Sequence, residues 1–463
     1  MSESELPPNP TPSTSQRAQL PESGLDRREV IRQMIERREK DASWHSGRTF
    51  SLVYHASDEH TQFLKEAFCL FFSENALNPS AFASLKQFEN EVVSIAAGLL
   101  GGDAETTGTM TSGGTESIFL CVKTYRDRAR SMAGGARTAP AAEPEIILPV
   151  TAHPAFDKAA HSLGVKLVHV PVDANFRADL EAVRAAINPR TILIVGSAPA
   201  YPQGVIDPIA ELAAIAAEKG LGMHVDACLG GFLLPFLREL GQPIPPFDFK
   251  VPGVTSMSAD LHKYGFAAKG ASTVLYRSAE LRKHQFYARS TWPGGLWGST
   301  TLAGTRPGGP IAAAWAALMA LGRDGYLRLA RTILATTQAF QSGIQAIPGL
   351  RILGQPDMSV FAFTSDGPDI FAIADAMEGR GWHVDRQHLP HSIHLMITPA
   401  HSTIVEPYLN DLRECVAHVS AHPELAAEGN AAAYGMLTRL PPGEATEEFV
   451  DGFILQHMDQ LYR

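Results

Sequence analysis

The chain has few cysteines and no long apolar run. Its 463 residues include four cysteines, none in a Cys-x-x-Cys pair, and this spacing excludes a disulfide framework and argues against a structural zinc site. We therefore expect reduced thiols at Cys69, Cys121, Cys228 and Cys415. The apolar run Ile311–Leu321 is far shorter than the ~20 residues that cross a bilayer, and no apolar signal segment follows Met1. The sequence predicts a cytoplasmic protein without a transmembrane segment, with only export by a non-Sec route left open.

Positive charge is also in short supply. Lys and Arg total 39 against 49 Asp and Glu, which gives a formal net charge of −10. An acidic surface repels both nucleic acid and anionic lipid, so neither is an expected partner. Hydrophobic residues make up 45% of the chain and charged residues 19%, a balance typical of globular proteins. The composition indicates an enzyme or a protein that binds small molecules.

The order of expected elements indicates an α/β fold with two parts. Residues 1–24 are rich in proline and hydroxyl residues, bury little apolar surface and are expected to form a flexible tail. Beyond residue 115, short apolar strands alternate with helices, which is typical of a mostly parallel sheet covered on both faces. The predicted strands are Ile146–Val150, Lys166–Val170, Thr191–Val195, Gly222–Val225, Thr255–Ser258 and Ser272–Tyr276. Two further helices, Gly309–Leu321 and Gly325–Gln345, lead into a second and smaller α/β unit.

Two glycine-rich segments have the composition of anion-binding loops. Thr111–Ser117 reads Thr-Ser-Gly-Gly-Thr-Glu-Ser and opens a helix, where free amides favour a phosphate. Gly294–Gly309 combines glycines with the hydroxyls of three neighbouring residues, Ser299, Thr300 and Thr301. Taken alone, the first segment could be an ordinary helix start and the second a flexible turn.

Two other segments place ionisable side chains directly after apolar strands. Asp226, in His-Val-Asp-Ala, can pair with a protonated heterocyclic nitrogen or simply cap the next turn. Lys263, in Ser258–Gly265, can form a Schiff base with a carbonyl cofactor. Burial would lower the pKa of this lysine and keep it nucleophilic. A solvated surface lysine is the alternative interpretation.

Together these segments resemble the pyridoxal-phosphate enzymes of fold type I, in the group II decarboxylase-like family, and among them the sphingosine-1-phosphate lyases. Five motifs carry the resemblance in the same order, Thr111–Ser117, Thr151–Ala160, His224–Phe232, Ser258–Gly270 and Gly294–Gly309, and the match runs from about Tyr54 to the C-terminus. The resemblance implies an aspartate aminotransferase-like α/β fold. The expected parts are a tail and N-terminal segment at 1–60, a large cofactor-binding domain at 61–324 and a small C-terminal α/β domain at 325–463.

The resemblance also implies a site for pyridoxal 5′-phosphate, and no metal. Lys263 matches the lysine that binds the cofactor covalently, Asp226 the partner of the pyridine nitrogen, and His153 the histidine that stacks on the ring. The groups that match the site of the cofactor phosphate are Gly114, Thr115 and His262. Gly298 and Ser299 match a loop that reaches this phosphate from the neighbouring subunit, which implies a homodimer with shared active sites.

Other matches concern the substrate. Tyr54, Asn75 and Lys269 match positions around a substrate phosphate, and Tyr201 lies in a motif near the active site. Asn78 departs from the family, which has a histidine there, and this puts the affinity for the substrate phosphate in question. The eukaryotic lyases carry an N-terminal membrane segment, and its expected absence here suggests a bacterial-type soluble enzyme.

The implied reaction is the cleavage of the Cα–Cβ bond of sphingosine 1-phosphate, or a related phosphorylated long-chain base, in sphingolipid degradation. The products are a long-chain aldehyde and phosphoethanolamine. The residues leave the general base open among Tyr54, Lys269, Tyr201 and the substrate phosphate. A decarboxylase of glutamate or of an aromatic amino acid is the alternative, because it would share Lys263, Asp226 and the stacking histidine. A catalytically silent scaffold is a third interpretation, which the intact Lys263 and Asp226 argue against.

Overall fold

The computed structural model describes residues 19–132, 143–437 and 443–462. It divides after Ser43 into two units, which are considered separately. The described part of the first unit contains the helix α1 (Arg27–Arg38), which begins where the Asp26 carboxylate accepts the Arg28 amide at 2.8 Å.

The second unit is built on a mostly parallel sheet, which confirms the predicted α/β class. Seven described strands follow the order β1-β7-β6-β5-β4-β2-β3. Strands β2 to β6 pair in parallel, whereas β7 runs antiparallel to both β1 and β6. Their bounds are β1 (Thr107–Thr111), β2 (Glu145–Pro149), β3 (Lys166–Val170), β4 (Thr191–Ser197), β5 (Gly222–Asp226), β6 (Ser256–Ala259) and β7 (Ser272–Tyr276).

Helices cover both faces of this sheet, because its central strands are apolar on both sides. Ile146 and Leu148 of β2 pack with helices α4 and α5, whereas Ile147 between them packs into the core on the opposite face. Helices α3, α6 and α7 cover that opposite face. The helices around the sheet are α2 (Asp58–Leu70), α3 (Ala83–Leu99), α4 (Gly114–Met132), α5 (Ala155–Leu163), α6 (Leu180–Ala186), α7 (Ile209–Glu218), α8 (Leu234–Glu239) and α9 (Ala279–Arg282).

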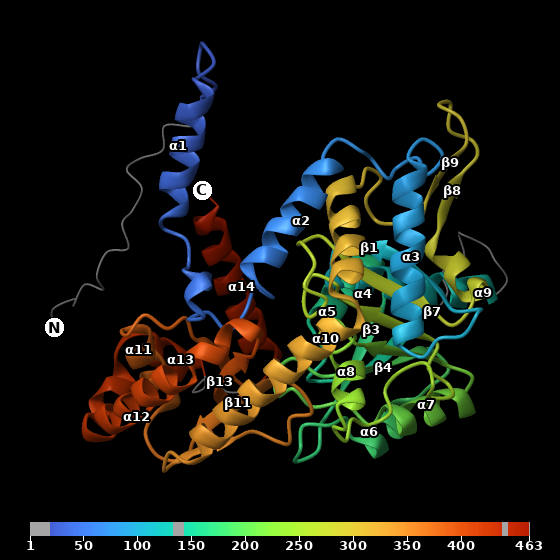
Figure 1. The fold of residues 1–463 in the computed structure, drawn as a ribbon. Coiled ribbons are helices and arrows are strands. Elements are labelled where there is room, and N and C mark those ends of the chain that lie inside the picture. The colour runs from blue at the N-terminus through green and yellow to red at the C-terminus, as the bar shows by residue number, and fades with distance from the viewer. Residues whose placement is uncertain (1–18, 133–142, 438–442, 463) are drawn as a thin grey trace. The chain divides into compact units, whose positions relative to one another are not determined.

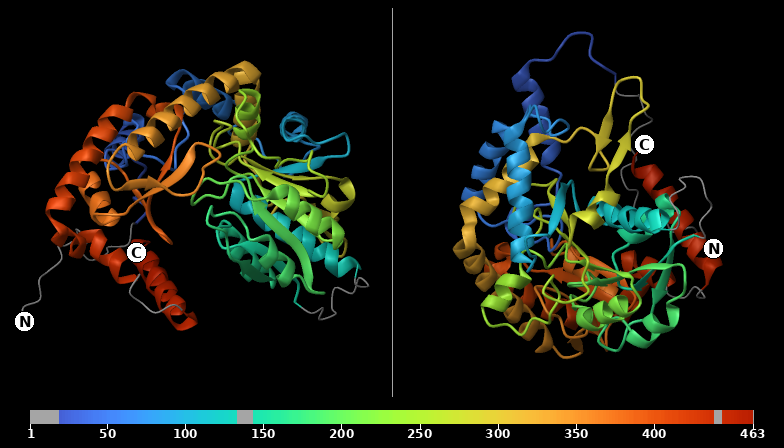
Figure 2. Two further views of the ribbon diagram at one scale, coloured as in Figure 1. Left: turned by 90° about the horizontal axis from the view of Figure 1, so that it is seen from below. Right: turned by 90° about the vertical axis from the view of Figure 1, so that its right-hand side faces the viewer.

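A smaller antiparallel sheet follows, in the order β10-β11-β13-β12. The long helix α10 (Gly308–Gln345) connects the two sheets, since Ile311 packs in the core of the large sheet and Phe340 in the core of the small one (Figure 2). The chain bends at Gly322, which has a φ of +55°, in the gap between the two helices predicted there. The elements of this part are β10 (Leu350–Ile352), β11 (Val360–Ser365), α11 (Ile370–Glu378), β12 (Asp385–His388), β13 (His391–Met396), α12 (Val405–Ala421), α13 (Gly429–Leu437) and α14 (Glu444–Leu461).

A short hairpin of β8 (Tyr287–Arg289) and β9 (Trp297–Ser299) extends away from the large sheet (Figure 1). It precedes α10 and includes the start of the glycine-rich segment. Among the described residues, no helix has the length and apolar character needed to cross a membrane. All four cysteines are unpaired.

Candidate active site

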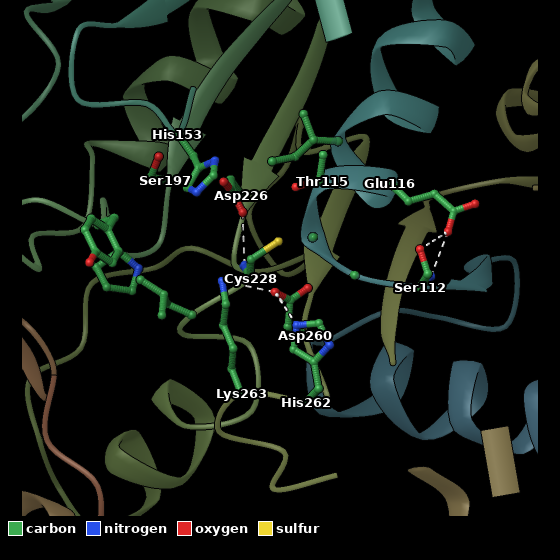
Figure 3. A pocket seen from close by; sticks show the side chains of 16 residues that line it. Ser112, Thr115, Glu116, His153, Ser197, Asp226, Cys228, Asp260, His262 and Lys263 are labelled. Carbon is green, nitrogen blue, oxygen red and sulfur yellow. Dashed lines mark hydrogen bonds and ion pairs between the residues drawn. The ribbon is translucent and has the colours of Figure 1, made fainter. Parts of the chain in front are cut away.

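A cavity of about 400 Å³, here called the main cavity, lies at the carboxyl ends of the parallel strands. Ser197 at the end of β4 and Asp226 at the end of β5 line it, together with the glycine turn before α4. Ligands of α/β folds bind at this edge of the sheet. The side chains of His153, Asp226, His262 and Lys263 converge on the cavity (Figure 3). The fold therefore brings together residues from four of the five sequence motifs.

The glycine turn brings the amino end of α4 against the main cavity. A Cβ atom on Gly114 would lie 2.9 Å from both the Asp260 carboxylate and the Cys228 sulfur, so a larger residue does not fit. The first amides of the helix lack partners within the helix and favour an anion. The Glu116 carboxylate fixes the turn, because one of its oxygens accepts both the amide and the hydroxyl of Ser112 at 2.7 Å.

Asp226 is held by hydrogen bonds from behind. Its Oδ1 accepts the Cys228 amide at 3.0 Å and the Ser258 hydroxyl at 3.1 Å. The imidazole of His224 lies between the hydroxyls of Ser256 and Ser258, at 2.8 and 3.2 Å. Burial lowers the pKa of His224 to about 4, so this imidazole is neutral at pH 7. The carboxylate is thus fixed in orientation beside a neutral network, with its side chain lining the cavity.

Lys263 faces a buried carboxylate. Its Nζ lies 3.0 Å from Asp260 Oδ2, and His262 Nε2 lies 3.5 Å from the same oxygen. Burial has the largest single effect and would lower the pKa of Lys263, but the neighbouring negative charges, that of Asp260 foremost, together outweigh burial and raise this pKa above its usual value. The expected lowering of the lysine pKa is therefore wrong, because the carboxylate three residues earlier shares the cavity.

His153 precedes α5, and the helix start orients its ring. Nδ1 accepts a hydrogen bond from the Ala155 amide at 3.1 Å, so in the neutral ring the proton is on Nε2. Burial lowers the pKa of His153, although Asp226 opposes this shift. A neutral imidazole fixed in this way can stack on an aromatic ligand in the main cavity.

Tyr201 lines the main cavity from the loop after β4. Its ring stacks on His394 with the ring centres 4.2 Å apart, and Nε2 of His394 lies 3.0 Å from the Tyr201 carbonyl oxygen. Burial, reinforced by the charge of Asp385, raises the pKa of Tyr201 to about 12. The phenol therefore keeps its proton at neutral pH and is available as a hydrogen-bond donor.

Lys269 and Tyr54 lie in a separate, mostly apolar recess of about 310 Å³, and His262 lines both this recess and the main cavity. Lys269 Nζ is 5.1 Å from the centre of the Tyr54 ring and 3.4 Å from the His262 carbonyl oxygen. Lys269 is accessible to solvent, yet desolvation by the walls of the recess and the charge of Lys263 lower its pKa to about 8. Burial raises the pKa of Tyr54 well above its usual value.

The other predicted site residues line neither of these two spaces within one chain. Gly298 and Ser299 line a third recess, of about 290 Å³, beside the β8–β9 hairpin. Asn75 joins two loops, because its Oδ1 accepts the amides of Leu77 at 2.9 Å and Arg306 at 3.3 Å. Within one chain, the residues predicted to contact the cofactor ring thus line one cavity, whereas Gly298, Ser299 and Asn75 lie outside it.

Among the residues of the main cavity without a predicted role at the site are three with ionisable side chains, Glu116, Cys228 and Asp260. Asp260 had a local signal, since a spacing of three residues before Lys263 is one at which side chains can meet. The contact of Glu116 with Leu302 had none, because the two residues are 186 positions apart. Cys228 is buried, and burial raises its pKa well above the usual value, so its thiol stays protonated.

Comparison with known proteins gives matches over most of the chain. The family described as pyridoxal-dependent decarboxylase conserved domain matches residues 17–365. A sphingosine-1-phosphate lyase of Arabidopsis thaliana is 45% identical over 451 residues, covering 96% of this chain and 81% of that protein. The structure of a Burkholderia pseudomallei sphingosine-1-phosphate lyase aligns with a TM-score of 0.83 at 40% identity, covering 93% of this chain and 99% of that one. A Lactobacillus brevis glutamate decarboxylase aligns with a TM-score of 0.76 at 19% identity, which is a likeness of fold.

Proposed function

The chain belongs to the sphingosine-1-phosphate lyase family, and we propose that it cleaves the Cα–Cβ bond of sphingosine 1-phosphate or a related phosphorylated long-chain base. The products are a long-chain aldehyde and phosphoethanolamine. One observation carries the proposal: Lys263, Asp226 and His153 surround one cavity, and His262 lines both this cavity and a recess that holds Lys269. A cofactor site and a cation suited to a phosphate thus lie next to each other.

The main cavity fits the cofactor of this family, pyridoxal 5′-phosphate. Its walls offer an amine on Lys263, a carboxylate on Asp226, an imidazole on His153 and the hydroxyl of Thr115 among the first amides of α4. The absence of a side chain on Gly114 leaves this helix start open. A volume of about 400 Å³ lies within the usual range of ligand sites. Amine, acid, aromatic and anion-binding groups are the set that a phosphorylated pyridine aldehyde needs.

When bound, the cofactor supplies an electron sink for the electron pair that stays on Cα after the Cα–Cβ bond breaks. Asp226 would hold a proton on the pyridine nitrogen through a charge-assisted hydrogen bond. His153 would lie against the ring, and the amides of α4 would hold the phosphate together with Thr115 and His262. Asp260 orients the Lys263 amine, which lies 3.0 Å away.

The adjoining recess binds the phosphate of the substrate in this proposal. In a phosphorylated long-chain base, the phosphate-bearing carbon is next to the amine-bearing carbon, so the two groups need neighbouring sites. Lys269 provides a cation that is mostly protonated at pH 7, since its pKa is about 8. Tyr54 in this recess and Tyr201 in the main cavity keep their phenolic protons and can act as hydrogen-bond donors. Asn75 would reach this phosphate only from a second chain.

An amino-acid decarboxylase, the alternative, would use the same Lys263, Asp226 and His153. It needs a site for a carboxylate or an aromatic side chain in place of a phosphate site. A lysine in a mostly apolar recess favours a phosphorylated lipid. The likeness to glutamate decarboxylase is one of fold and does not extend to the substrate.

A homodimer with shared active sites is part of the same proposal. Gly298 and Ser299 lie at the end of an exposed hairpin, and apolar side chains on the same loop are open to solvent, including Leu296 and Trp292, which are 89% and 53% exposed. Exposed apolar groups of this kind are typical of interaction surfaces. A second copy of the chain would cover them and bring Gly298 and Ser299 to the cofactor phosphate of its partner.

The test is to incubate the purified protein, loaded with pyridoxal 5′-phosphate, with sphingosine 1-phosphate and to measure both products by mass spectrometry. We expect equal amounts of long-chain aldehyde and phosphoethanolamine, and neither product from Lys263→Ala. Parallel reactions with glutamate and with aromatic amino acids measure released carbon dioxide. Carbon dioxide release without aldehyde formation would show that the protein is a decarboxylase and contradict the proposed lyase activity.

A further inference from the structure

Glu116 connects two parts of the chain that are distant in sequence. It lies in the first turn of α4 and is 8% exposed. Its Oε2 accepts the amide and the hydroxyl of Ser112, both at 2.7 Å (Figure 3). Its Oε1 accepts the amide of Leu302 at 2.9 Å. In the described part of the chain, no lysine or arginine forms an ion pair with this carboxylate. Three donors on two segments therefore share one buried carboxylate.

The segment that carries Leu302 is anchored at neighbouring points as well. The Gln285 side chain, which is 2% exposed, donates to the Thr300 carbonyl and to the Thr109 hydroxyl of β1. The Ser299 hydroxyl donates to the Thr301 carbonyl at 2.9 Å. The hairpin before these anchors is exposed, so the position of its last residues depends on them.

Glu116 thus lies between two phosphate-binding elements. On one side it fixes Ser112, at the glycine turn that holds the cofactor phosphate in the same chain. On the other side it fixes Leu302, three residues after Ser299, which reaches the partner's cofactor phosphate in the proposed dimer. This inference rests on the proposed function, because it needs the shared sites of that dimer.

We propose that Glu116 is a positioning residue for both cofactor sites of the dimer, its own through Ser112 and its partner's through Leu302. Both carboxylate oxygens serve as acceptors, so only an unmodified carboxylate of this length supports both contacts. In Glu116→Gln, an NH2 group replaces one of the two carboxylate oxygens. This NH2 group is a donor, and it would face a donor group of Ser112 or Leu302 where the oxygen accepted a hydrogen bond. This substitution therefore breaks at least one connection and leaves the size of the side chain unchanged.

A hybrid dimer separates the two effects. One chain carries Glu116→Gln together with Lys263→Ala, the other chain is unaltered, and two affinity tags isolate the mixed dimer. Only the unaltered chain can hold the cofactor through Lys263, so the visible absorbance of the covalently bound cofactor reports one site. That site contains the glycine turn of the unaltered chain and the hairpin of the altered chain. Any loss of affinity there has crossed the interface.

We expect the cofactor dissociation constant of that site to rise about tenfold, the lower end of what the loss of a hydrogen bond to a charged group produces. Leu302→Pro in place of Glu116→Gln removes the amide donor on the hairpin side while Glu116 itself stays unchanged, and it should act in the same way, which keeps the test valid if the first variant folds poorly. The control is Glu280→Gln, the same change on a carboxylate that is 81% exposed. Its hybrid should match the one with Lys263→Ala alone.

A cofactor affinity within twofold of the control in both the Glu116→Gln and the Leu302→Pro hybrids would overturn the inference. A further hybrid with changes at Gly298 and Ser299 distinguishes this result from a failure of the shared sites. If that hybrid weakens cofactor binding and the other two do not, the sites are shared and Glu116 acts only within its own chain. If none weakens binding, the shared sites and the inference fail together, while cleavage of sphingosine 1-phosphate by the unaltered protein remains a separate measurement.

Discussion

Two lysines six positions apart differ in pKa because their neighbours differ. Lys263 lies 3.0 Å from the Asp260 carboxylate, which keeps its pKa above the usual value against the effect of burial. Lys269 lies beside the aromatic ring of Tyr54, and desolvation together with the charge of Lys263 lowers its pKa to about 8. Lys269 is thus the lysine of this site that changes charge near physiological pH.

The pH dependence of the reaction should therefore follow Lys269. As the pH rises through about 8, Lys269 loses its proton and its attraction for the substrate phosphate, so kcat/KM for the phosphorylated substrate should fall. The substrate phosphate is doubly charged throughout this range, since its second pKa is near ~6. Lys269→Arg keeps a positive charge at every pH of the assay and should remove the alkaline decline.

Lys269→Ala tests the same assignment by a comparison of two substrates, one with and one without the phosphate. The loss of a charge-assisted contact with the phosphate should cost about 1.5–3 kcal/mol in transition-state binding for the phosphorylated substrate and little for its unphosphorylated analogue. The measurement is kcat/KM for both compounds. Equal losses on both would assign Lys269 to the chemical step, and unchanged rates on both would make it an ordinary surface lysine.

Replacing Lys263 should affect stability as well as activity. Lys263→Ala leaves Asp260, whose side chain is 1% exposed, with the His262 imidazole at 3.5 Å and without its lysine partner. Removing one member of a buried pair costs about 3–5 kcal/mol in unfolding free energy. Lys263→Arg keeps the pair but has no amine for the cofactor. We expect urea unfolding to distinguish the two variants and cofactor absorbance to be lost in both. Equal stability would show that Asp260 does not depend on Lys263.

The residues that the sequence could indicate are those with local signals. Asp226 and Lys263 follow apolar strands, and His153 lies in a motif matched to the family. The contact between Glu116 and Leu302 depends on how the chain returns after 186 residues, which local pattern cannot express. The sign of the Lys263 pKa shift depends on a distance to Asp260, so burial alone gave the wrong direction.

At the scale of elements, apolar patterning predicted the parallel strands, including β3 at one edge of the large sheet, and missed β1 at the other edge. β1 reads Thr-Gly-Thr-Met-Thr and contains one large apolar residue, so its apolar pattern does not indicate a strand. Its pairing with β7 depends on where the folded chain brings the two segments together, which a local pattern does not show. The helix α10 was predicted as two helices on either side of Gly322, where the chain bends. The bounds of β3 and β7 are as predicted, whereas those of β2, β4, β5 and β6 differ from the prediction by one or two residues, because an apolar run marks the buried part of a strand and not its hydrogen-bonded ends.

The loop that carries Tyr201 depends on a glycine. Gly204 has a φ of +69°, and a Cβ atom there would lie 1.7 Å from the Val360 carbonyl oxygen at the start of β11. Gly204→Ala should therefore lower the unfolding free energy by about 2–6 kcal/mol, from backbone strain and overlap together. Gly220→Ala is the matched control, because Gly220 has a φ of +66° and open space around it.

The control variant should lose only the backbone term of about 1–3 kcal/mol. Urea unfolding of both variants gives the difference between them. Equal losses of unfolding free energy in the two variants would mean that β11 moves away from the new methyl group at little cost. The contact between this loop and the small sheet would then be easily deformed.

At the scale of the whole molecule, the sequence predicts the order of the elements that form the two sheets, but not how the sheets are arranged in space. The expected domain boundary at 324/325 falls inside α10, two residues beyond the bend at Gly322, and the boundaries at 60/61 and 324/325 stay predictions. No pattern in one chain reveals which exposed apolar side chains a second copy covers. The recess of Gly298 and Ser299, separate from the main cavity, therefore calls for a test with two kinds of chain.

Complementation between two inactive chains provides that test. One chain carries Lys263→Ala and the other carries Gly298→Asp with Ser299→Ala. A Cβ atom at position 298 meets only the Tyr287 carbonyl at 3.7 Å, so the new carboxylate should repel a phosphate without disturbing the fold. If sites are shared, each mixed dimer gathers both defects in one site and leaves the other intact. Random mixing should then restore about one quarter of the activity of the unaltered dimer. Mixing without recovery, with subunit exchange confirmed by mass spectrometry of differently tagged chains, would mean that each chain completes its own site and that Gly298 and Ser299 act elsewhere.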